Sequence, residues 1–242
     1  MFANLMKHLL RIGHPLPRQL VNGYLEWTLV RDVLTMLDIN CVLDVGANQG
    51  QYAKNLRRIG YRGHICSFEP IKQDFETLLD AFKDDPHWTG FNFALGNENT
   101  QKPFNVATEC SAMSSFLSPT DPNWRLHTAT VEIKRLDTIF EPIMTRIGMT
   151  QPRVFLKMDT QGYDVEVIRG AQSHIDKILG LQSEISIMPI YSGMPHYLDA
   201  LGFYESLDFC LFGASEAARN PDEDSLLEMN CIMVHKNGQG AR

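Results

Sequence analysis

Short apolar runs alternate with amphipathic segments along most of the chain. Five runs have the length and composition of buried strands: 41–45, 64–69, 91–95, 154–158 and 181–187. Four segments have the three-to-four-residue apolar spacing of helices: about 51–59, 75–82, 165–178 and 195–201. Alternation of apolar strands with helices predicts an α/β fold with a largely parallel sheet and helices on both faces.

Both ends of the chain and one internal segment depart from this rhythm. Residues 1–37 have a helical pattern that breaks at 14–17, and we interpret them as an N-terminal helical extension. Residues 97–140 are polar with short alternating runs, which indicates an inserted β segment. Residues 204–212 and 231–235 are predicted strands with no helix between them, so we expect an antiparallel pair at one edge of a seven-stranded sheet. One domain over 38–242 follows from this organisation.

Composition narrows the class of protein. The chain has 242 residues, 44% hydrophobic and 21% charged, which suits one α/β domain with a sizeable core and excludes fibrous and wholly disordered proteins. The 22 basic and 29 acidic residues give a net charge of −7. Because such a chain lacks the broad basic field that binds nucleic-acid phosphates, we expect no nucleic-acid partner.

The cysteines and the first residues bear on location. Three of the five cysteines, Cys41, Cys66 and Cys231, lie in apolar strand-like runs, and none forms a Cys-x-x-Cys pair. Free buried thiols indicate a reducing compartment, so we expect a cytoplasmic protein. No apolar run approaches the roughly 18 residues of a membrane-spanning helix. The N-terminal stretch lacks signal-peptide features, and we expect a helix packed over the domain, with an amphipathic helix on a membrane surface as the alternative.

Residues 42–52 carry the strongest chemical signal. A strand passes into a turn that contains Gly46 and Gly50 and then into a helix, which is where an open α/β sheet binds a nucleotide-like ligand. The glycine spacing fits neither the dinucleotide pattern nor the phosphate-loop pattern. Asp44, at the strand end, would repel a pyrophosphate and suits a ligand with an amine or sulfonium group. A plain strand-to-helix turn with a capping Asn is the structural alternative.

Glu69 supports the ligand interpretation. It ends the second predicted strand, where a carboxylate can accept hydrogen bonds from a ribose diol. Pro70 stops the strand, so the carboxylate stays at the rim of the sheet. We therefore predict that Glu69 binds a ribose and is not merely a solvated surface charge.

Four segments together resemble the FkbM family of S-adenosylmethionine-dependent methyltransferases: 44–50 (DVGANQG), 68–70 (FEP), 94–96 (ALG) and 156–164 (LKMDTQGYD). The resemblance extends over roughly 40–235. It implies a Rossmann-like class I methyltransferase domain that uses S-adenosylmethionine. Members typically methylate hydroxyl oxygens of sugars and of other small or carrier-linked metabolites. The family commonly has Glu where this chain has Gln161. The amide keeps the size and polarity of Glu but has no charge, which counts against an acid–base role for this position.

The resemblance also assigns roles to single residues. Gly46, Asn48 and Gly50 would line the cofactor, with Asp44 near its methionine amine and Tyr52 close by. Glu69 would hold the ribose, and Ala94 and Leu95 would lie against adenine. A buried core strand would have the same apolar character as residues 94–95, so that assignment keeps a structural alternative.

Methyl transfer to a hydroxyl needs an acceptor oxygen in line with the leaving sulfur and a group that takes up its proton. Lys157 and Asp159 lie at the end of the fourth predicted strand and, by strand periodicity, share one face at the carboxyl edge of the sheet. We predict that Asp159 binds or deprotonates the acceptor hydroxyl. Lys157 would keep Asp159 ionised or stabilise developing negative charge, unless the two form only a self-neutralising ion pair.

Other side chains offer weaker alternatives. Glu184, on the fifth predicted strand, could join Asp159 in holding a divalent cation through oxygen ligands, whereas the histidine spacing does not support zinc. His127 is an alternative base, and it lies in the insertion near Trp124 and Arg125. Loops over the ligand crevice often carry specificity, so we expect the insertion to shape the acceptor pocket.

Three competing functions share this pattern. A nicotinamide-dependent sugar-nucleotide oxidoreductase is disfavoured by the glycine spacing and by the lack of a Tyr-x-x-x-Lys motif. A non-catalytic module that retains the cofactor pocket has Gln161 as its one supporting feature. RNA 2′-O-methylation can use Lys, Asp and Glu at comparable places, but the acidic balance counts against it.

Overall fold

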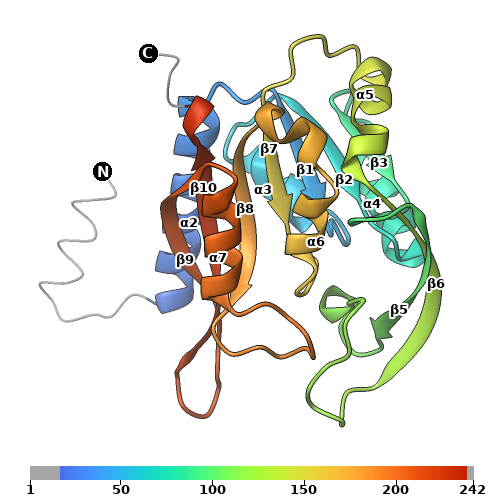
Figure 1. Cartoon of the computed structure of the whole chain (residues 1–242), viewed down its shortest axis with the longest axis vertical. Coiled ribbons are helices and arrows are strands. Elements are labelled where there is room, and N and C mark those ends of the chain that lie inside the picture. Colours follow the sequence, from blue (N-terminus) through green and yellow to red (C-terminus); the bar gives the residue numbers. More distant parts are fainter. Residues whose placement is uncertain (1–16, 239–242) are drawn as a thin grey trace, which may run out of the picture.

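A computed structural model, which describes residues 17–238, contains a seven-stranded sheet in the order β3-β2-β1-β7-β8-β10-β9 (Figure 1). Its strands are β1 (Cys41–Val45), β2 (His64–Phe68), β3 (Trp88–Phe91), β7 (Val154–Met158), β8 (Ile178–Ser186), β9 (Phe209–Arg219) and β10 (Leu226–His235). The pairs from β3 to β8 are parallel, and β10 runs antiparallel to both β8 and β9. The predicted mostly parallel sheet with an antiparallel edge pair is confirmed.

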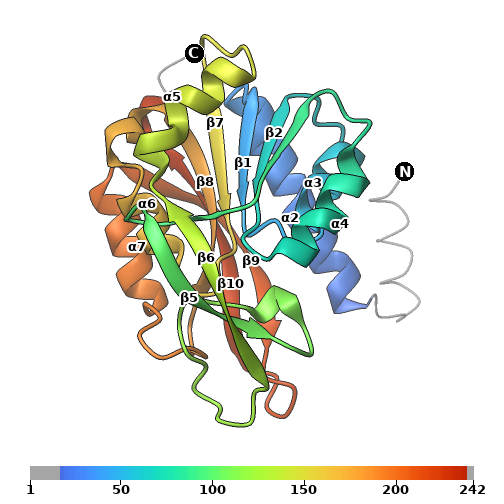
Figure 2. The ribbon, with the colours of Figure 1, turned by 90° about the vertical axis from the view of Figure 1, so that its right-hand side faces the viewer.

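Helices cover both faces of this sheet (Figure 2). They are α2 (Arg18–Met36), α3 (Gln51–Arg58), α4 (Lys72–Phe82), α5 (Leu136–Arg146), α6 (Asp164–Arg169) and α7 (Tyr197–Ser206), with short 3₁₀ turns at Ser111–Met113, Gln172–Lys177 and Lys236–Gly238. One core lies under α2, α3 and α4, and a second lies under α5, α6 and α7. The result is a three-layer α/β domain of the Rossmann-like type.

The apolar runs of β1 and β7 follow from their place between the two cores. All five residues of each strand are buried. Val42 and Phe155 pack into the core under α2, whereas Leu43 and Leu156 pack into the opposite core. A strand that is covered on both faces needs apolar residues at successive positions, which is why these two strands were easy to predict.

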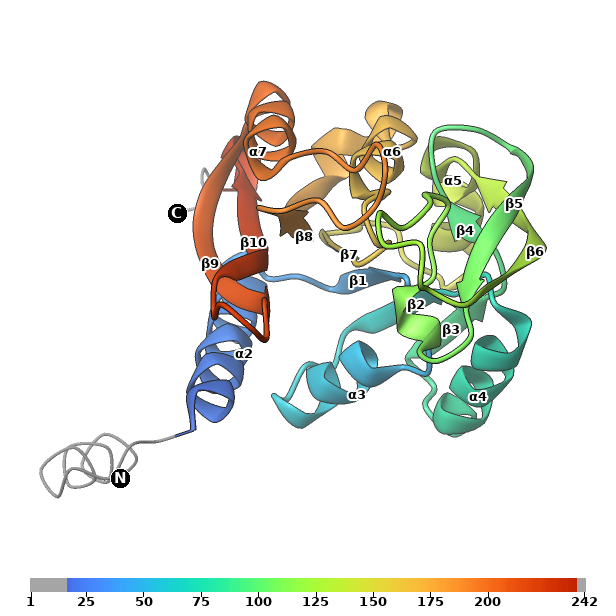
Figure 3. The ribbon, with the colours of Figure 1, turned by 90° about the horizontal axis from the view of Figure 1, so that it is seen from below.

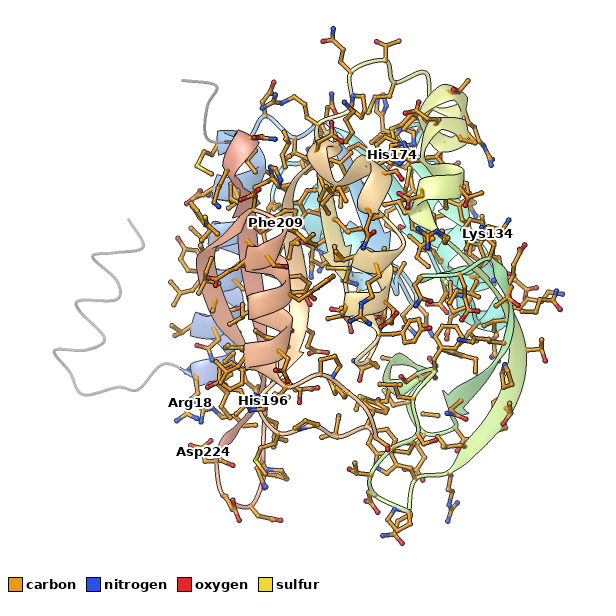
Figure 4. All side chains as sticks on the ribbon, viewed as in Figure 1. Arg18, Lys134, His174, His196, Phe209 and Asp224 are labelled. Atoms are coloured by element: carbon orange, nitrogen blue, oxygen red, sulfur yellow. The ribbon has the colours of Figure 1, made fainter. Side chains whose placement is uncertain are left out.

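The predicted strand over 91–95 is wrong, because the chain leaves the main sheet between β3 and β4 (Ala94–Leu95). The Asn92 side-chain amide donates to the Glu69 carbonyl oxygen at 2.8 Å and holds this turn. β4 then joins a small sheet in the order β4-β6-β5, made with β5 (Thr100–Ala107) and β6 (Leu126–Lys134). Lys134, the last residue of β6, is labelled in Figure 4, and its ammonium lies 4.4 Å from the centre of the Phe93 ring. The inserted β segment is therefore present.

Helix boundaries differ from the predictions at three places. Residues 136–140, assigned to the insertion, begin α5, whose buried residues Leu136, Phe140 and Ile143 have helical spacing. Of the helix predicted over 165–178, only the part up to Arg169 is α-helical, and a separate 3₁₀ turn follows at Gln172–Lys177. Residues 204–206, predicted as strand, complete α7, and a left-handed residue, Asp208, precedes β9.

The α2 helix is built into the domain. Its residues Val30, Val33 and Leu34 are buried in the same core as Val42 of β1. Arg18, at the start of α2, pairs at 2.8 Å with Asp224 in the turn between β9 and β10 (Figure 4). The part of the predicted helical extension that precedes the break, residues 1–13, lies outside the described residues. No helix within residues 17–238 has the length and hydropathy needed to cross a membrane.

Candidate active site

A cleft of about 580 Å3, its open mouth included, lies beyond the carboxyl ends of β1 and β2. The strand order reverses between β1 and β7, and ligands of open α/β sheets bind at such a point. Seen from below in Figure 3, the insertion and the segment between β8 and α7 extend over these strand ends. Six residues predicted for the site line the cleft: Gly46, Asn48, Glu69, Ala94, Leu95 and Asp159.

Gly46 places the β1–α3 turn directly against the loop that follows β7. Its φ is +73°, and a Cβ atom there would lie 2.0 Å from the carbonyl oxygen of Asp159. The Gly46 and Ala47 amides donate to the Phe68 carbonyl oxygen at 3.1 and 3.0 Å. Only glycine leaves room for the Asp159 carbonyl group here, so Gly46 allows the backbone of Asp159 to pack directly against the β1–α3 turn.

Gly50, which the resemblance places beside the cofactor, lies against α4. It precedes α3 with a φ of +84°, and a Cβ atom there would lie 2.6 Å from the Phe82 ring and 2.8 Å from Leu78. Both contacts belong to α4, and Gly50 is not among the residues that line the cleft. The absence of a side chain at position 50 permits close packing of α3 on α4.

Glu69 is the buried carboxyl group of the cleft, with 4% of its surface exposed. Its Oε2 accepts a hydrogen bond from the backbone amide of Asn48 at 2.8 Å, and its Oε1 accepts one from the backbone amide of Ile71 at 2.7 Å. Burial raises the pKa of Glu69 to about 7, although these two hydrogen bonds act in the opposite direction. Each carboxylate oxygen keeps a further lone pair, so Glu69 can still accept hydrogen bonds from ligand hydroxyls.

Ala94, Leu95 and residues of the insertion form a further part of the cleft lining, most of which is apolar. Ala94 and Leu95 are buried, and Phe104 packs against Phe116 with ring centres 4.8 Å apart. The insertion residues in this part of the lining also include Ser111, Ala112 and Ser114. The side-chain amide of Asn48 donates to Ser111 Oγ at 3.0 Å and so ties the β1–α3 turn to the insertion. The alternation of strands and helices did not predict Phe104 as a cleft residue. Its position depends on how the insertion packs on the rest of the domain, which the sequence pattern does not show.

Asp44 and Lys157 form a buried ion pair beneath the turn. The Lys157 Nζ lies 3.0 Å from Asp44 Oδ1 and 3.7 Å from Asp159 Oδ2. Burial lowers the pKa of Lys157, but the charges of Asp44 and Asp159 more than offset it, so the net pKa is raised. Neither Asp44 nor Lys157 lines the cleft. Lys157 therefore stays protonated and bridges the two carboxylates.

Tyr52 belongs to a polar network on the α2 side of the sheet and does not line the cleft. The Lys157 Nζ lies 5.1 Å from the centre of its ring, and its hydroxyl donates to Gln182 Oε1 at 2.7 Å. The amides of Gln182 and Asn230 both donate to Glu26 Oε1, at 3.0 and 2.9 Å. Burial raises the pKa of Tyr52 well above its usual value, so this phenol remains protonated.

Asp159 is the accessible carboxyl group, because 42% of its side-chain surface is exposed where it lines the cleft. The Gln161 side-chain amide donates to Asp159 Oδ1 at 3.1 Å and to Glu184 Oε2 at 3.0 Å. An amide thus bridges the two carboxyl groups that were predicted to share a cation. Within residues 17–238, no group of three or more His, Cys, Asp or Glu side chains is arranged to hold a metal ion.

The other candidates lie outside the cleft. His127, the alternative base, is exposed on β6 and is not among the residues that line the cleft. Trp124 and Arg125 line a separate groove of about 710 Å3, open to solvent, together with Glu109, Asp121 and Asn123. Trp124 packs edge-on against Tyr191, with ring centres 5.6 Å apart.

Comparison with known proteins agrees with the motifs. A family model described as the methyltransferase FkbM domain matches residues 44–207, which is well over half of the chain. A comparison with curated protein sequences gave no match.

Three similar solved structures are methyltransferases or fibrillarins. The fibrillarin pre-rRNA processing protein of Methanococcus jannaschii is 11% identical, over 82% of this chain and 67% of that one, with a TM-score of 0.47. Aeropyrum pernix fibrillarin with natively bound S-adenosyl-L-methionine is 13% identical, over 79% and 66%, with a TM-score of 0.43. The precorrin-6y C5,15-methyltransferase of Geobacter metallireducens is 13% identical, over 86% and 87%, also with a TM-score of 0.43.

The cleft fits the cofactor of this family. A ribose diol is a hydrogen-bond donor that the buried Glu69 carboxylate can satisfy, and the wall of Ala94, Leu95 and Phe104 suits a flat aromatic base. A nicotinamide-dependent oxidoreductase finds no support in the family match. The chain belongs to the FkbM family of methyltransferases.

Proposed function

We propose that the protein transfers a methyl group from S-adenosylmethionine to a hydroxyl oxygen of a sugar or of a small metabolite that carries a sugar. The observation that carries this proposal is that one cleft contains a buried carboxyl group, Glu69, and a half-exposed one, Asp159. The first suits a fixed ligand and the second suits exchange of a proton with an entering substrate.

The residues of the cleft divide between the two parts of the cofactor. Glu69 would accept hydrogen bonds from the ribose hydroxyls, and Ala94 and Leu95 would lie against the adenine. The turn that contains Gly46 and Asn48 would hold the methionine end. Bound in this way, the cofactor supplies an electrophilic methyl group on a positively charged sulfur.

Asp159 would bind the acceptor hydroxyl and take up its proton as the new C–O bond forms and the C–S bond breaks. A hydroxyl is barely ionised at neutral pH, so a carboxylate within hydrogen-bond distance lowers the barrier to its attack. The protonated Lys157, 3.7 Å from Asp159 Oδ2, would keep the carboxylate ionised before it accepts the proton.

Support for a sugar acceptor comes from the groove on the insertion. It combines the half-buried aromatic ring of Trp124 with the hydrogen-bonding groups of Asp121, Asn123 and Arg125. Aromatic rings stack on the C–H faces of sugars, while carboxylates, amides and guanidinium groups bind their hydroxyls. The groove and the cleft share the 3₁₀ turn Ser111–Met113 as a common wall.

Isothermal titration with S-adenosylhomocysteine tests the cofactor site. We expect the wild type to bind and Glu69→Ala to bind about tenfold or more weakly, because it loses charge-assisted hydrogen bonds. Glu76→Gln, an exposed change on α4, is the matched control and should leave the affinity unchanged. Unchanged affinity in Glu69→Ala would remove Glu69 from the cofactor site.

The acceptor class needs a separate experiment. The protein is incubated with methyl-labelled S-adenosylmethionine and a fractionated small-molecule extract, and labelled products are identified by mass spectrometry. Label on a sugar oxygen supports the proposal. Label on nitrogen, on carbon or on a compound without a sugar would overturn it.

A further inference from the structure

Gln161 lies in the loop after β7, where it is buried and contacts Asp159, which lines the cleft, and Glu184 of the neighbouring strand β8. Its exposed surface is 7%, and its backbone adopts a left-handed φ of +52°. The two N–H groups of its side chain point at different carboxyl oxygens, Asp159 Oδ1 at 3.1 Å and Glu184 Oε2 at 3.0 Å. Gln161 therefore spans the ends of two neighbouring strands.

The oxygen of this amide faces Tyr191. The Tyr191 hydroxyl lies 2.9 Å from Gln161 Oε1 and 2.8 Å from the Met113 carbonyl oxygen, so these two acceptors share its one proton. The backbone carbonyl of Gln161 accepts a hydrogen bond from Ser115 Oγ at 2.7 Å, which fixes the loop itself. Because carboxylate oxygens accept hydrogen bonds and a phenol hydroxyl can donate, the amide nitrogen faces the two carboxyl groups and the amide oxygen faces Tyr191.

Tyr191 is held in place by a junction between two segments that are distant in sequence. The Thr120 amide donates to the Ile190 carbonyl oxygen at 2.8 Å, and the Ser192 amide donates to the Ser118 carbonyl oxygen at 2.7 Å. Tyr191 is 2% exposed, between these contacts. The insertion and the β8–α7 segment thus meet across the carboxyl ends of the central strands (Figure 3).

The surroundings of Asp159 are strongly acidic, which makes a neutral side chain at position 161 significant. The charged and titratable groups around it are Glu26 of α2, Lys157 of β7, Asp164 of α6, Glu184 of β8, Glu228 of β10 and Tyr191. Burial raises the pKa of Glu184 well above its usual value and that of Glu228 to about 7, and the Asp159 charge adds to both shifts. A carboxylate at position 161 would add repulsion, whereas an amide adds hydrogen-bond donors.

We propose that Gln161 is a positioning residue, which directs one oxygen of Asp159 away from the acceptor and leaves the other for it, and that Tyr191 holds Gln161 in this donating orientation. This inference rests on the methyltransferase function proposed above. Asp159 Oδ1 receives the Gln161 amide, while Oδ2 faces the Lys157 ammonium at 3.7 Å and remains free to accept from a hydroxyl. The second N–H group of the Gln161 side chain donates to Glu184 Oε2 and so anchors the amide to β8.

The test follows the carboxyl groups directly and needs no acceptor. Carboxyl carbons of Asp and Glu are labelled with 13C, the Asp159 resonance is assigned with Asp159→Asn, and its titration midpoint is compared between variants. Gln161→Leu removes both donors and should raise this midpoint by about one pH unit. Gln161→Glu keeps the shape but adds a charge, and it should raise the midpoint further, because a nearby like charge disfavours ionisation.

Two further variants complete the design. Tyr191→Phe should move the midpoint in the same direction by less, because the amide loses its fixed orientation. Gln101→Glu, the same change at an exposed position of β5, should leave the midpoint unchanged. A merely structural role for Gln161 would leave the midpoint unchanged in Gln161→Leu, which removes the donors without adding a charge.

An unmoved midpoint in Gln161→Leu, in protein that retains its fold by circular dichroism, would overturn the positioning role. If Gln161→Leu does not fold, Tyr191→Phe decides the question by the same readout, because it also adds no charge. Failure of S-adenosylhomocysteine to bind the wild type would instead overturn the proposed function. The two failures are distinguishable, because the carboxyl titration uses neither cofactor nor acceptor.

Discussion

Asp44 and Lys157 are cross-strand neighbours in the parallel pair of β1 and β7, and their charged atoms lie 3.0 Å apart with both side chains buried. This pairing gives Asp44 a partner other than the cofactor's methionine amine. It also places the only cation that contacts Asp159 in the described part of the chain beneath the site, where burial limits screening by solvent. The same lysine therefore serves the stability of the sheet and the role proposed for Asp159.

Lys157→Met should lower the free energy of unfolding by about 3–5 kcal/mol, because it leaves the Asp44 carboxylate buried without its cation. Urea denaturation measures this loss. Lys177→Met, which breaks an exposed pair with Asp176, is the control and should cost less than about 1 kcal/mol. Equal small losses in the two variants would contradict a structural role for the buried pair.

Cofactor affinity should depend on pH through Glu69. Burial raises the pKa of this group to about 7, so protonation below that pH removes the charged acceptor of the ribose hydroxyls. For a group with that pKa, the ionised fraction falls about tenfold between pH 8 and pH 6, and S-adenosylhomocysteine affinity should fall equally. Calorimetric titrations at the two pH values measure this change. Glu69→Gln should bind more weakly and lose the pH dependence; a dependence that persists would place its origin elsewhere.

Asp159→Asn should keep S-adenosylhomocysteine affinity within about twofold, because Asn retains the size and part of the polarity of the side chain. Turnover should fall by about 10²–10⁴, the usual contribution of a general base. Asp176→Asn, an exposed change in the 3₁₀ turn Gln172–Lys177, serves as the control. Release of S-adenosylhomocysteine with the identified acceptor gives the rate, and near-normal turnover would exclude Asp159 as the base.

Gly46→Ala should impair both stability and cofactor affinity. Its added methyl group would meet the Asp159 carbonyl oxygen, which lies 2.0 Å from the Cβ position and belongs to the backbone. Gly60→Ala isolates the conformational cost, because Gly60 also has a positive φ, +97°, but its Cβ would contact nothing within 4 Å. We expect about 1 kcal/mol of destabilisation at Gly60 and clearly more at Gly46. Thermal unfolding and S-adenosylhomocysteine titration compare the two, and equal effects would rule out the contact with Asp159.

The sheet could be predicted from the sequence because its central strands are buried on both faces. Successive apolar residues in β1 and β7 reflect the two cores directly, and glycines and Glu69 mark the strand ends where a ligand binds. The same local pattern failed at residues 91–95, where an apolar run continues across a turn held by Asn92 and a distant carbonyl group. Periodicity records burial but not which sheet a strand joins.

The residues themselves therefore determined the α/β architecture, the family and the cleft position of Glu69, Gly46 and Asp159, since each depends on a strand and the turn that follows it. Only the tertiary structure paired Asp44 with Lys157, turned Gly50 toward α4, and joined Gln161 to Tyr191 and Glu184. These contacts depend on strand order and on where two long loops meet. A linear pattern does not encode such distances, because they arise when segments far apart in the chain pack together.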